Sequence, residues 1–326
     1  MFGKTYPKQA KTRMFFVYYI AVYFTCINKS NMNLNNYLKE KRKLVDSFLK
    51  KYISAKKRRK DCPKHLAEAM GYALTAGGKR VRPILAIASY EAAGGTAESI
   101  LPVASSIELI HTYSLIHDDL PAMDNDDLRR NKPTTHRAFG EAEAILAGDA
   151  LLTDAFNIIS EADAKPTLLL KVINELSYGS GPEGMVGGQS MDILLEGKKA
   201  DKKRLLYIHT HKTGALIRAS IRIGAIMANA SPAKLEALTD YGEKIGLAFQ
   251  VTDDILDVTG TMEEMGKPTG SDNSKGKNTY PSIFGLDESR KIAKKLVNDS
   301  LKALNGFGKK AGPLEEIAKY ILARRN

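Results

Sequence analysis

Cysteine and histidine are scarce in this chain, which has two cysteines and six histidines in 326 residues. Neither Cys26 nor Cys62 stands in a Cys-x-x-Cys pair, so a disulfide framework and a structural zinc site are not expected. Runs that alternate apolar and polar residues are also scarce, which predicts few or no β-strands. No repeat, low-complexity stretch or linker interrupts residues 33–326.

The basic excess of the chain is confined to its beginning. The formal net charge is +12, but residues 1–60 hold 16 Lys and Arg against 2 Asp and Glu, and the remainder holds 33 against 35. A nucleic-acid-binding function would therefore rest on the first sixty residues alone, and these show no basic motif interleaved with aromatic residues. No nucleic-acid partner is expected, and the basic run at 56–60 is interpreted as a solvated helix end.

Residues 1–31 form an N-terminal arm with three competing interpretations. Basic residues precede an apolar run from Met14 to Ile27, as in a signal peptide, but no clear cleavage site follows. An over-extended gene start, with Met32 as the true start, is preferred over a targeting or anchoring segment and over a genuine extra arm. No later run is judged apolar enough for a membrane span, so residues 32–326 are expected to form a soluble, cytoplasmic domain.

The domain is expected to be all-α. Apolar residues of the first segment, from Leu34 to Ile53, recur at steps of three and four among charged residues, which is typical of an amphipathic helix. Further helices are expected over 65–75, 84–93 and 100–119, and glycine pairs end the first two. A single helical bundle with a continuous core follows.

An aspartate cluster ends the long apolar helix. It consists of Asp118, Asp119 and Asp124, and Arg129 and Arg130 follow it. Pro121 breaks the helix, so the chain can fold Asp124 back toward Asp118. Buried carboxylates that meet are costly without a cation, and Mg²⁺ favours a few carboxylates together with phosphate oxygens. Metal binding is therefore preferred over an acidic turn, and the arginine pair points to diphosphate chemistry.

A second cluster lies on a helix that is apolar almost all round. It consists of Asp253, Asp254 and Asp257. Asp253 and Asp257 share one face, with Gln250 on the same side. Like charges one turn apart in such a helix are destabilising unless something positive binds there. A metal or diphosphate function is therefore favoured over two surface carboxylates.

Cations near glycines could hold a diphosphate without metal. They are Lys79 and Arg82 beside Gly77-Gly78, Lys212 before Thr213-Gly214, and Lys267 after Gly266. Each alone is explained better as a solvated side chain than as a functional one, and only the combination with the two acidic clusters supports a role in binding diphosphate. A metal phosphohydrolase of the His-Asp type is an alternative, with His111, His117 and Asp253 as ligands. It leaves the remaining aspartates without a role.

Five ordered motifs resemble those of trans-prenyl diphosphate synthases, most closely bacterial farnesyl diphosphate synthases. The motifs are Gly77-Gly-Lys79-Arg80-Val-Arg82-Pro, the segment 118–130, Gly187-Gly-Gln189-Ser-Met-Asp192, His211-Lys212-Thr213-Gly, and Gln250-Val-Thr-Asp253-Asp254-Ile-Leu-Asp257. The pieces at 266–267 and 276–281 also fit. The resemblance runs from about Asn33 to the C-terminus, and the ordered set is highly specific.

The resemblance implies an isoprenoid synthase-type helical bundle, homodimeric, with the aspartate motifs facing each other across a deep central cavity. The implied reaction is the head-to-tail (1′-4) condensation of isopentenyl diphosphate with dimethylallyl or geranyl diphosphate to farnesyl diphosphate, by ionisation, condensation and elimination. Three Mg²⁺ ions per active site are implied. The implied metal ligands are Asp118, Asp119, Asp124, Asp253 and Asp257. The implied isopentenyl diphosphate ligands are Lys79, Arg82, His111 and Arg130. The implied allylic diphosphate ligands are Arg129, Lys212 and Lys267, and the implied catalytic residues are Lys212, Thr213 and Gln250.

Tyr113 and Ser114 are the candidates for setting product length. Tyr113 precedes Asp118 by five residues, or about 7.5 Å of helix. Its ring is therefore expected to form the floor of a shallow cavity and to favour a C15 product. The alternative is that Tyr113 only packs in the core. A geranylgeranyl diphosphate synthase, a class I terpene cyclase and a non-catalytic partner subunit are the other functions weighed. A cyclase needs no second diphosphate pocket, so it would leave Lys79 and Arg82 without a role. A non-catalytic subunit is expected to lack aspartates that are present here.

Overall fold

The structure is a computed structural model that describes residues 32–198, 201–260 and 278–323. The arm of residues 1–31 and Lys267 lie outside the described residues. From Leu34 onward the chain forms one compact unit. In its described part the strands are a short antiparallel pair, β1 (Leu128–Arg129) and β2 (Lys132–Pro133), and the other regular elements are helices. The expected all-α fold is confirmed.

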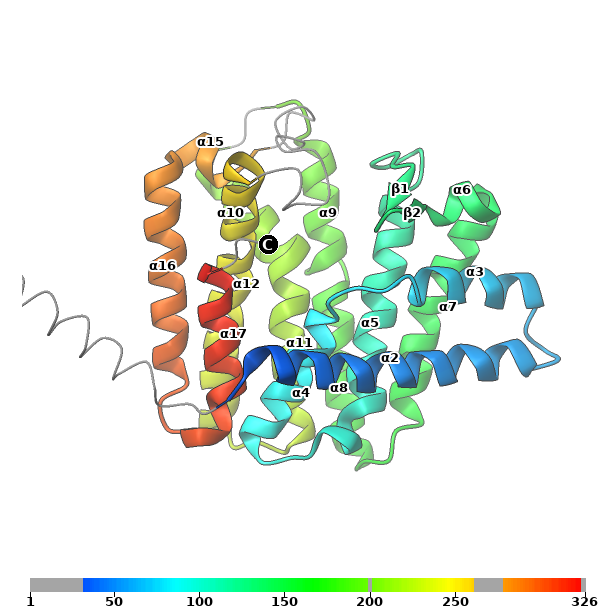
Figure 1. The fold of residues 1–326 in the computed structure, drawn as a ribbon, viewed down its shortest axis with the longest axis horizontal. Helices are drawn as coiled ribbons and strands as arrows, with labels where there is room; N and C mark the ends of the chain where they lie inside the picture. Colours follow the sequence, from blue (N-terminus) through cyan, green and yellow to red (C-terminus); the bar gives the residue numbers. More distant parts are fainter. Residues whose placement is uncertain (1–31, 199–200, 261–277, 324–326) are drawn as a thin grey trace, which may run out of the picture. The chain divides into compact units, whose positions relative to one another are not determined.

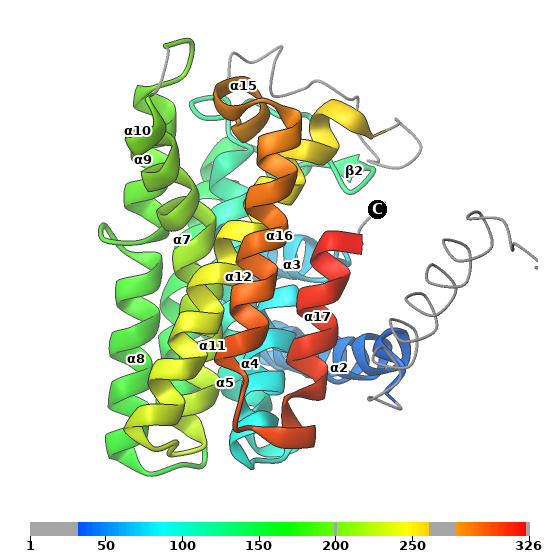
Figure 2. The same cartoon turned by 90° about the vertical axis from the view of Figure 1, so that its left-hand side faces the viewer.

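The helices form a bundle (Figure 1). In chain order they are α2 (Leu34–Arg58), α3 (Lys64–Leu74), α4 (Val81–Ala93), α5 (Ala97–Asp118), α6 (Thr135–Phe139), α7 (Glu141–Ser160), α8 (Pro166–Ser180), α9 (Met185–Leu194), α10 (Lys202–Ile208), the π-helix η1 (His209–Ala215), α11 (Leu216–Met227), α12 (Pro232–Thr259), α15 (Tyr280–Phe284), α16 (Leu286–Ala303), the 3₁₀-helix η2 (Gly308–Ala311) and α17 (Gly312–Ala323). Helices α5, α7, α11, α12 and α16 share one general direction, and α2 runs across it, as Figure 2 also shows.

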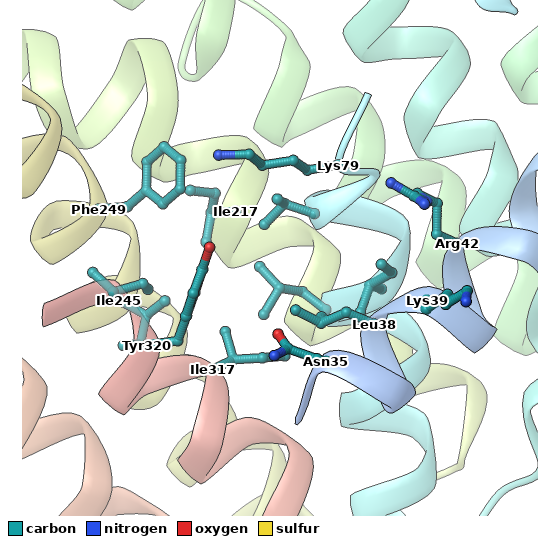
Figure 3. A pocket seen from close by; sticks show the side chains of 14 residues that line it. Asn35, Leu38, Lys39, Arg42, Lys79, Ile217, Ile245, Phe249, Ile317 and Tyr320 are labelled. Carbon is teal, nitrogen blue, oxygen red and sulfur yellow. The ribbon is translucent and has the colours of Figure 1, made fainter. Parts of the chain in front are cut away.

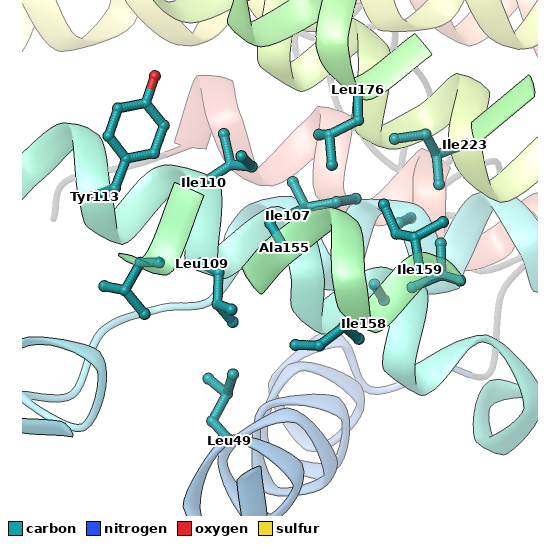
Figure 4. Close-up of a cluster of buried hydrophobic side chains, with 14 of the residues drawn as sticks. Leu49, Ile107, Leu109, Ile110, Tyr113, Ala155, Ile158, Ile159, Leu176 and Ile223 are labelled. Atoms are coloured by element: carbon teal, nitrogen blue, oxygen red, sulfur yellow. The ribbon is translucent and has the colours of Figure 1, made fainter. Parts of the chain in front are cut away.

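Two large groups of buried apolar side chains form most of the core. The first joins α2, α5 and α7 through residues such as Leu49, Ile107 and Ile159, with Tyr113 at its edge (Figure 4). The second joins α4, α11, α12 and α17 around Tyr241, whose hydroxyl donates to the Leu314 carbonyl at 2.7 Å. The helical periodicity therefore predicts the core well, because most of these apolar faces have a neighbouring helix to pack against.

Helix α5 requires one correction of the sequence expectations. Among the described helices it alone is long and apolar enough to cross a membrane by length and composition, so the expectation that no later run would qualify is wrong. The physical reason is packing, since 67% of that stretch is buried inside the fold, against α7 and α4 in particular. An apolar composition on all faces is what a helix in the centre of a bundle needs.

The side chain of Arg80, at the start of α4, forms hydrogen bonds with residues of α2, α3 and α5. The Arg80 backbone is left-handed, with φ of 52°, and its side chain is 2% exposed. Nε donates to Asp46 of α2 at 2.9 Å, Nη1 donates to Glu108 of α5 at 2.6 Å, and Nη2 donates to the carbonyl of Leu74 in α3 at 2.8 Å. The buried Arg80–Glu108 pair thus fixes the segment that carries Lys79 and Arg82.

The π-helix η1 lies directly against α9. Gly188 of α9 makes this possible, because a Cβ atom there would lie 2.0 Å from the backbone nitrogen of Lys212. A π-helical turn inside an otherwise α-helical segment is rare and is found mostly at functional sites. Here it carries His211, Lys212 and Thr213, the residues singled out from the sequence.

Candidate active site

The first aspartate cluster is assembled by the turn after α5. Asp118 is the last residue of that helix, and the backbone N–H of Asp124 donates to the Asp118 carbonyl at 2.9 Å. The N–H of Asn125 closes the same turn by donating to the Leu120 carbonyl at 3.1 Å. The predicted return of Asp124 toward Asp118 is therefore confirmed.

Asp119 lies on the other side of the turn and contacts Arg129. It is buried, and it accepts from Nε of Arg129 at 2.7 and 2.9 Å, with Nη2 of the same arginine at 2.6 Å. This contact anchors the strand pair β1–β2 to the end of α5. The implied roles of Asp119 as a metal ligand and of Arg129 as a diphosphate ligand stay predictions.

Arg130 reaches back to the glycine loop before α4. Its Nη1 donates to the Gly77 carbonyl, and its guanidinium lies against Gly78. A Cβ at Gly78 would lie 2.8 Å from that guanidinium, and the backbone φ of +133° also favours glycine. The sequence suggested that these glycines admit an anion to the backbone, and in the structure Gly78 admits an arginine side chain.

Arg82 and His111 lie together, whereas Lys79 does not line their cavity. Nη1 of Arg82 donates to Nε2 of His111 at 3.3 Å. Burial, and then Arg82 and three further arginines, hold the pKa of His111 well below its usual range, so its ring is a neutral acceptor. Lys79 lines a neighbouring, mostly apolar cavity of about 280 Å³, where its side chain extends toward Phe249 (Figure 3).

Lys212 lies between the two acidic helices. Its Nζ contacts Oδ2 of Asp192 on α9 at 2.6 Å, and its charge opposes the rise in the pKa of Asp118 that burial causes. Lys212 and Thr213 also line a small cavity of about 110 Å³ with Gln250 and Asp254 of α12. The π-helix therefore brings these two residues to the ends of both aspartate motifs.

The three aspartates of the second cluster differ in their burial and in their contacts. Asp254 is buried, accepts from the backbone N–H of Tyr280 at 2.8 Å and lies 3.6 Å from Nε2 of His209. Asp257 is also buried. Asp253 is half-buried, and its charge opposes the fall in the pKa of Arg82 that burial causes. Asp254 thus holds the start of α15 against α12, and Asp253 faces the Arg82 side of the site.

A cavity of about 660 Å³ runs from Asp118 along α5, α9 and η1. The residues that line it are Arg82, His111, Tyr113, Ser114, Leu115, His117, Asp118, Leu120, Ala122, Met123, Ile145, Met185, Val186, Gln189, Ser190, Ile193, Lys212 and Thr213. Its lining combines the charged side chains of Arg82, Asp118 and Lys212 with apolar side chains of α5 and α9. Its size suits a ligand with an anionic head and a hydrocarbon chain.

The donor set fits a hard divalent cation. Burial raises the pKa of Asp118 to about 6, with Asp124 and Asp119 adding to the rise and Lys212 opposing it. In the described ranges no three His, Cys, Asp or Glu side chains meet closely enough to form a metal centre alone. Carboxylates that need further oxygen ligands match Mg²⁺, which is usually held by one or two carboxylates together with substrate phosphates.

The raised pKa of Asp118 predicts a pH-dependent demand for Mg²⁺. Below pH of about 6 this carboxyl holds a proton that a metal ion must displace, so the Mg²⁺ concentration for half-maximal activity should rise by up to roughly tenfold per pH unit. Titrations with Mg²⁺ between pH 5 and 8 measure this. Asp127→Asn, which changes an exposed carboxylate, should leave the profile unchanged. A Mg²⁺ demand that is flat across this range would contradict the prediction.

Several lining residues were not given roles from the sequence. Met185, Val186 and Ile193 of α9 form the apolar wall opposite α5, and Asp192 contacts Lys212. Asp192 stands in one of the five motifs, but its partner is twenty positions away, and no spacing rule connects the two. The apolar residues of α9 carried no signal beyond helical periodicity.

Comparison with known proteins decides the family. Residues 63–319 match the family described as Polyprenyl synthetase. The chain belongs to this family. It is 45% identical to a geranylgeranyl diphosphate synthase of Cyanophora paradoxa, covering 91% of this chain and 99% of that one. It is 43% identical to a farnesyl diphosphate synthase of Geobacillus stearothermophilus, covering 90% and 99%.

A solved structure agrees with the sequence relatives. The crystal structure of a farnesyl/geranylfarnesyl diphosphate (FPP/GFPP) synthase from Zymomonas mobilis superposes with a TM-score of 0.80 at 38% identity, covering 89% of this chain and 99% of that one. This chain is therefore a prenyltransferase, a trans-prenyl diphosphate synthase of isoprenoid biosynthesis with the all-α isoprenoid synthase fold. The phosphohydrolase alternative is excluded by this family and gains nothing from the site, because His117 donates to a backbone carbonyl and His111 accepts from Arg82.

Proposed function

We propose that this prenyltransferase condenses isopentenyl diphosphate with dimethylallyl or geranyl diphosphate to give farnesyl diphosphate. The observation that carries the proposal is the cavity of about 660 Å³, which is lined by Arg82, Asp118 and Lys212 together with Tyr113 and apolar side chains of α9. A diphosphate held by these charged side chains would leave the prenyl chain to lie along the apolar ones. Tyr113 then limits the length of that chain.

The allylic carbon–oxygen bond breaks first, and the electron pair leaves with the diphosphate. Lys212 supplies fixed positive charge there, while the side-chain oxygens of Thr213 and Gln250 stabilise the allylic cation. The double bond of isopentenyl diphosphate then attacks the cation and forms the new carbon–carbon bond. A proton is lost in the last step. His111 is a poor base because Arg82 occupies its acceptor nitrogen, so the released diphosphate takes the proton.

Asp118, Asp124 and Asp253 are the residues proposed to hold Mg²⁺, with Asp119 and Asp257 nearby. Mg²⁺ bound there would stabilise negative charge on the departing diphosphate. The apolar side chains that line the cavity would limit the access of water to the cation that forms. Arg82, His111 and Arg130 are proposed to hold isopentenyl diphosphate. Lys79 is proposed to join them from the neighbouring cavity.

The direct test is incubation of the purified chain with Mg²⁺, isopentenyl diphosphate and either dimethylallyl or geranyl diphosphate. Chromatography of the dephosphorylated products should show farnesol as the main alcohol, and EDTA should abolish it. A chain lacking residues 1–31 should give the same product. Absence of any condensation product with Mg²⁺ present would overturn the proposal.

Geranylgeranyl diphosphate is the second candidate product. It is favoured by the name of the relative from Cyanophora paradoxa, which is as similar to this chain as the farnesyl diphosphate synthase is. The same chromatogram distinguishes the two candidates. A main C20 alcohol would identify geranylgeranyl diphosphate as the product and would show that Tyr113 does not limit the chain to C15.

Tyr113→Ala is predicted to lengthen the product. The ring is buried in the cavity wall, so its removal should deepen the cavity and shift the main product from C15 to C20 or longer. Product chromatography at a fixed ratio of substrates measures the shift. Tyr90→Ala is the matched control, because that half-buried ring on α4 contacts the hydroxyl of Ser99 and does not line this cavity. An unchanged C15 product from Tyr113→Ala would show that the ring only packs in the core.

A homodimer is also proposed for this chain. Several large apolar side chains on α7, α8 and α9 are exposed without lining the cavity, namely Leu146, Leu170, Tyr178 and Leu194. Exposed apolar surface of this extent on neighbouring helices is typical of an interface. Light scattering of the purified chain should give twice the mass of 35.8 kDa. A monomer at micromolar concentration would contradict the proposal.

A further inference from the structure

The imidazole of His117 lies between α5 and α7 beside the cavity. Its Nε2 donates to the Ile145 carbonyl at 3.1 Å and lies 3.9 Å from Oδ1 of Asp149. On its other side the ring packs edge to face against Tyr113, with centroids 5.7 Å apart and planes at 76°. His117 therefore connects the ring of Tyr113 to the start of α7.

Gly148 makes the room that this imidazole occupies. The residue is buried in α7, and a Cβ atom there would lie 2.1 Å from Nε2 and 2.5 Å from Cδ2 of His117. Both distances are too short for any side chain to share the space. With the ring in its present place, position 148 can only be glycine.

We propose that Gly148 and His117 determine product length by fixing where the floor of the cavity lies. His117, Tyr113 and Ile145 all line the cavity, and His117 contacts the other two. Gly148 does not line the cavity and acts only through His117. The inference rests on the proposed chain-elongating function, and it places a specificity determinant on α7 as well as on α5.

Substitutions at positions 148 and 117 are expected to change the depth of the cavity in opposite directions. A methyl group at position 148 cannot be absorbed, because α7 is close-packed against α5. The ring of His117 must then give way, and the open side is the cavity, which becomes shorter. Removal of the ring instead leaves Tyr113 without its neighbour, so the phenol can swing aside and the cavity becomes deeper.

The test compares product lengths for Gly148→Ala, His117→Ala and the double variant. A methylene-sized change in an apolar pocket is worth about tenfold in discrimination. The C10 to C15 ratio should therefore rise about tenfold in Gly148→Ala, and the C20 to C15 ratio should rise about tenfold in His117→Ala. The double variant should match His117→Ala, because the clash disappears with the ring.

Two matched controls separate this effect from general damage to the helices. Gly71→Ala adds a methyl group 2.8 Å from Cγ2 of Ile53 at the packing of α3 against α2, away from the cavity. His65→Ala removes a histidine that lies 3.6 Å from Glu143 of α7 without lining the cavity. Both should keep the product distribution of the unmodified chain.

The outcomes distinguish this inference from the proposed function. An unmodified chain that condenses nothing refutes the function. An active chain whose Gly148→Ala and His117→Ala variants keep the C15 product, or whose double variant makes shorter chains, refutes the inference alone. If Gly148→Ala does not fold, His117→Phe decides. It keeps a ring in place and should keep C15, and a product as long as that of His117→Ala would overturn the inference.

Discussion

Replacing Lys212 by alanine is expected to lower kcat by about 10²–10³-fold, the usual cost of removing one fixed charge from a developing anion. Lys212 is held by Asp192 at 2.6 Å and lines both the large cavity with Asp118 and the small one with Gln250. No other described lysine lines either cavity. Steady-state kinetics with saturating isopentenyl and geranyl diphosphates measure the loss.

Asp192, which contacts Lys212, and the remote Lys203 provide the controls for this result. Asp192→Asn keeps a hydrogen-bond acceptor but frees the ammonium from its counter-charge, so a smaller fall in kcat is expected. Lys203→Ala changes an exposed lysine of α10 and should leave kcat unchanged. If Lys212→Ala kept kcat within threefold of the unmodified chain, its assigned role in diphosphate departure would be wrong.

Glu108→Ala is expected to lower the free energy of unfolding by about 3–5 kcal/mol, the cost of removing one partner from a buried ion pair. Both side chains of the Arg80–Glu108 pair are 2% exposed, at a separation of 2.6 Å. The substitution leaves Arg80 buried with Asp46 as its remaining carboxylate. Urea unfolding followed by circular dichroism measures the change.

An exposed pair provides the comparison. Asp61→Ala removes the partner of Arg59 on the surface, where solvent screens the charges, and its unfolding midpoint should not move. Glu108→Gln keeps the hydrogen bond and should fall between the two. A loss smaller than about 1 kcal/mol for Glu108→Ala, the range of an exposed pair, would show that water reaches Arg80.

The sequence predicts those parts of the site that depend on local rules. Pro121 ends α5, so the return of Asp124 to Asp118 follows from backbone chemistry alone. Helical spacing likewise predicts that Asp253 and Asp257 are neighbours along α12. The ordered motifs then indicate the family and the reaction, which no single spacing could do.

The remaining features depend on contacts between distant segments. Lys79 and Arg82 are three residues apart, yet they line different cavities, and the left-handed backbone of Arg80 lies between them. The pairing of Arg129 with Asp119 and of Lys212 with Asp192 joins segments that only the folded bundle brings together. Sequence patterns report local periodicity, so they do not reveal such pairings.

The close approach of α9 to η1 at Gly188 has a consequence for how the enzyme responds to its substrates. Because the backbone of Gly188 lies directly against that of Lys212, and Asp192 of α9 holds the Lys212 side chain, a shift of η1 is expected to move α9 with it. A diphosphate that draws Lys212 toward itself must also carry the apolar wall formed by α9. Amide hydrogen exchange along α9 should therefore slow when a diphosphate binds to Lys212.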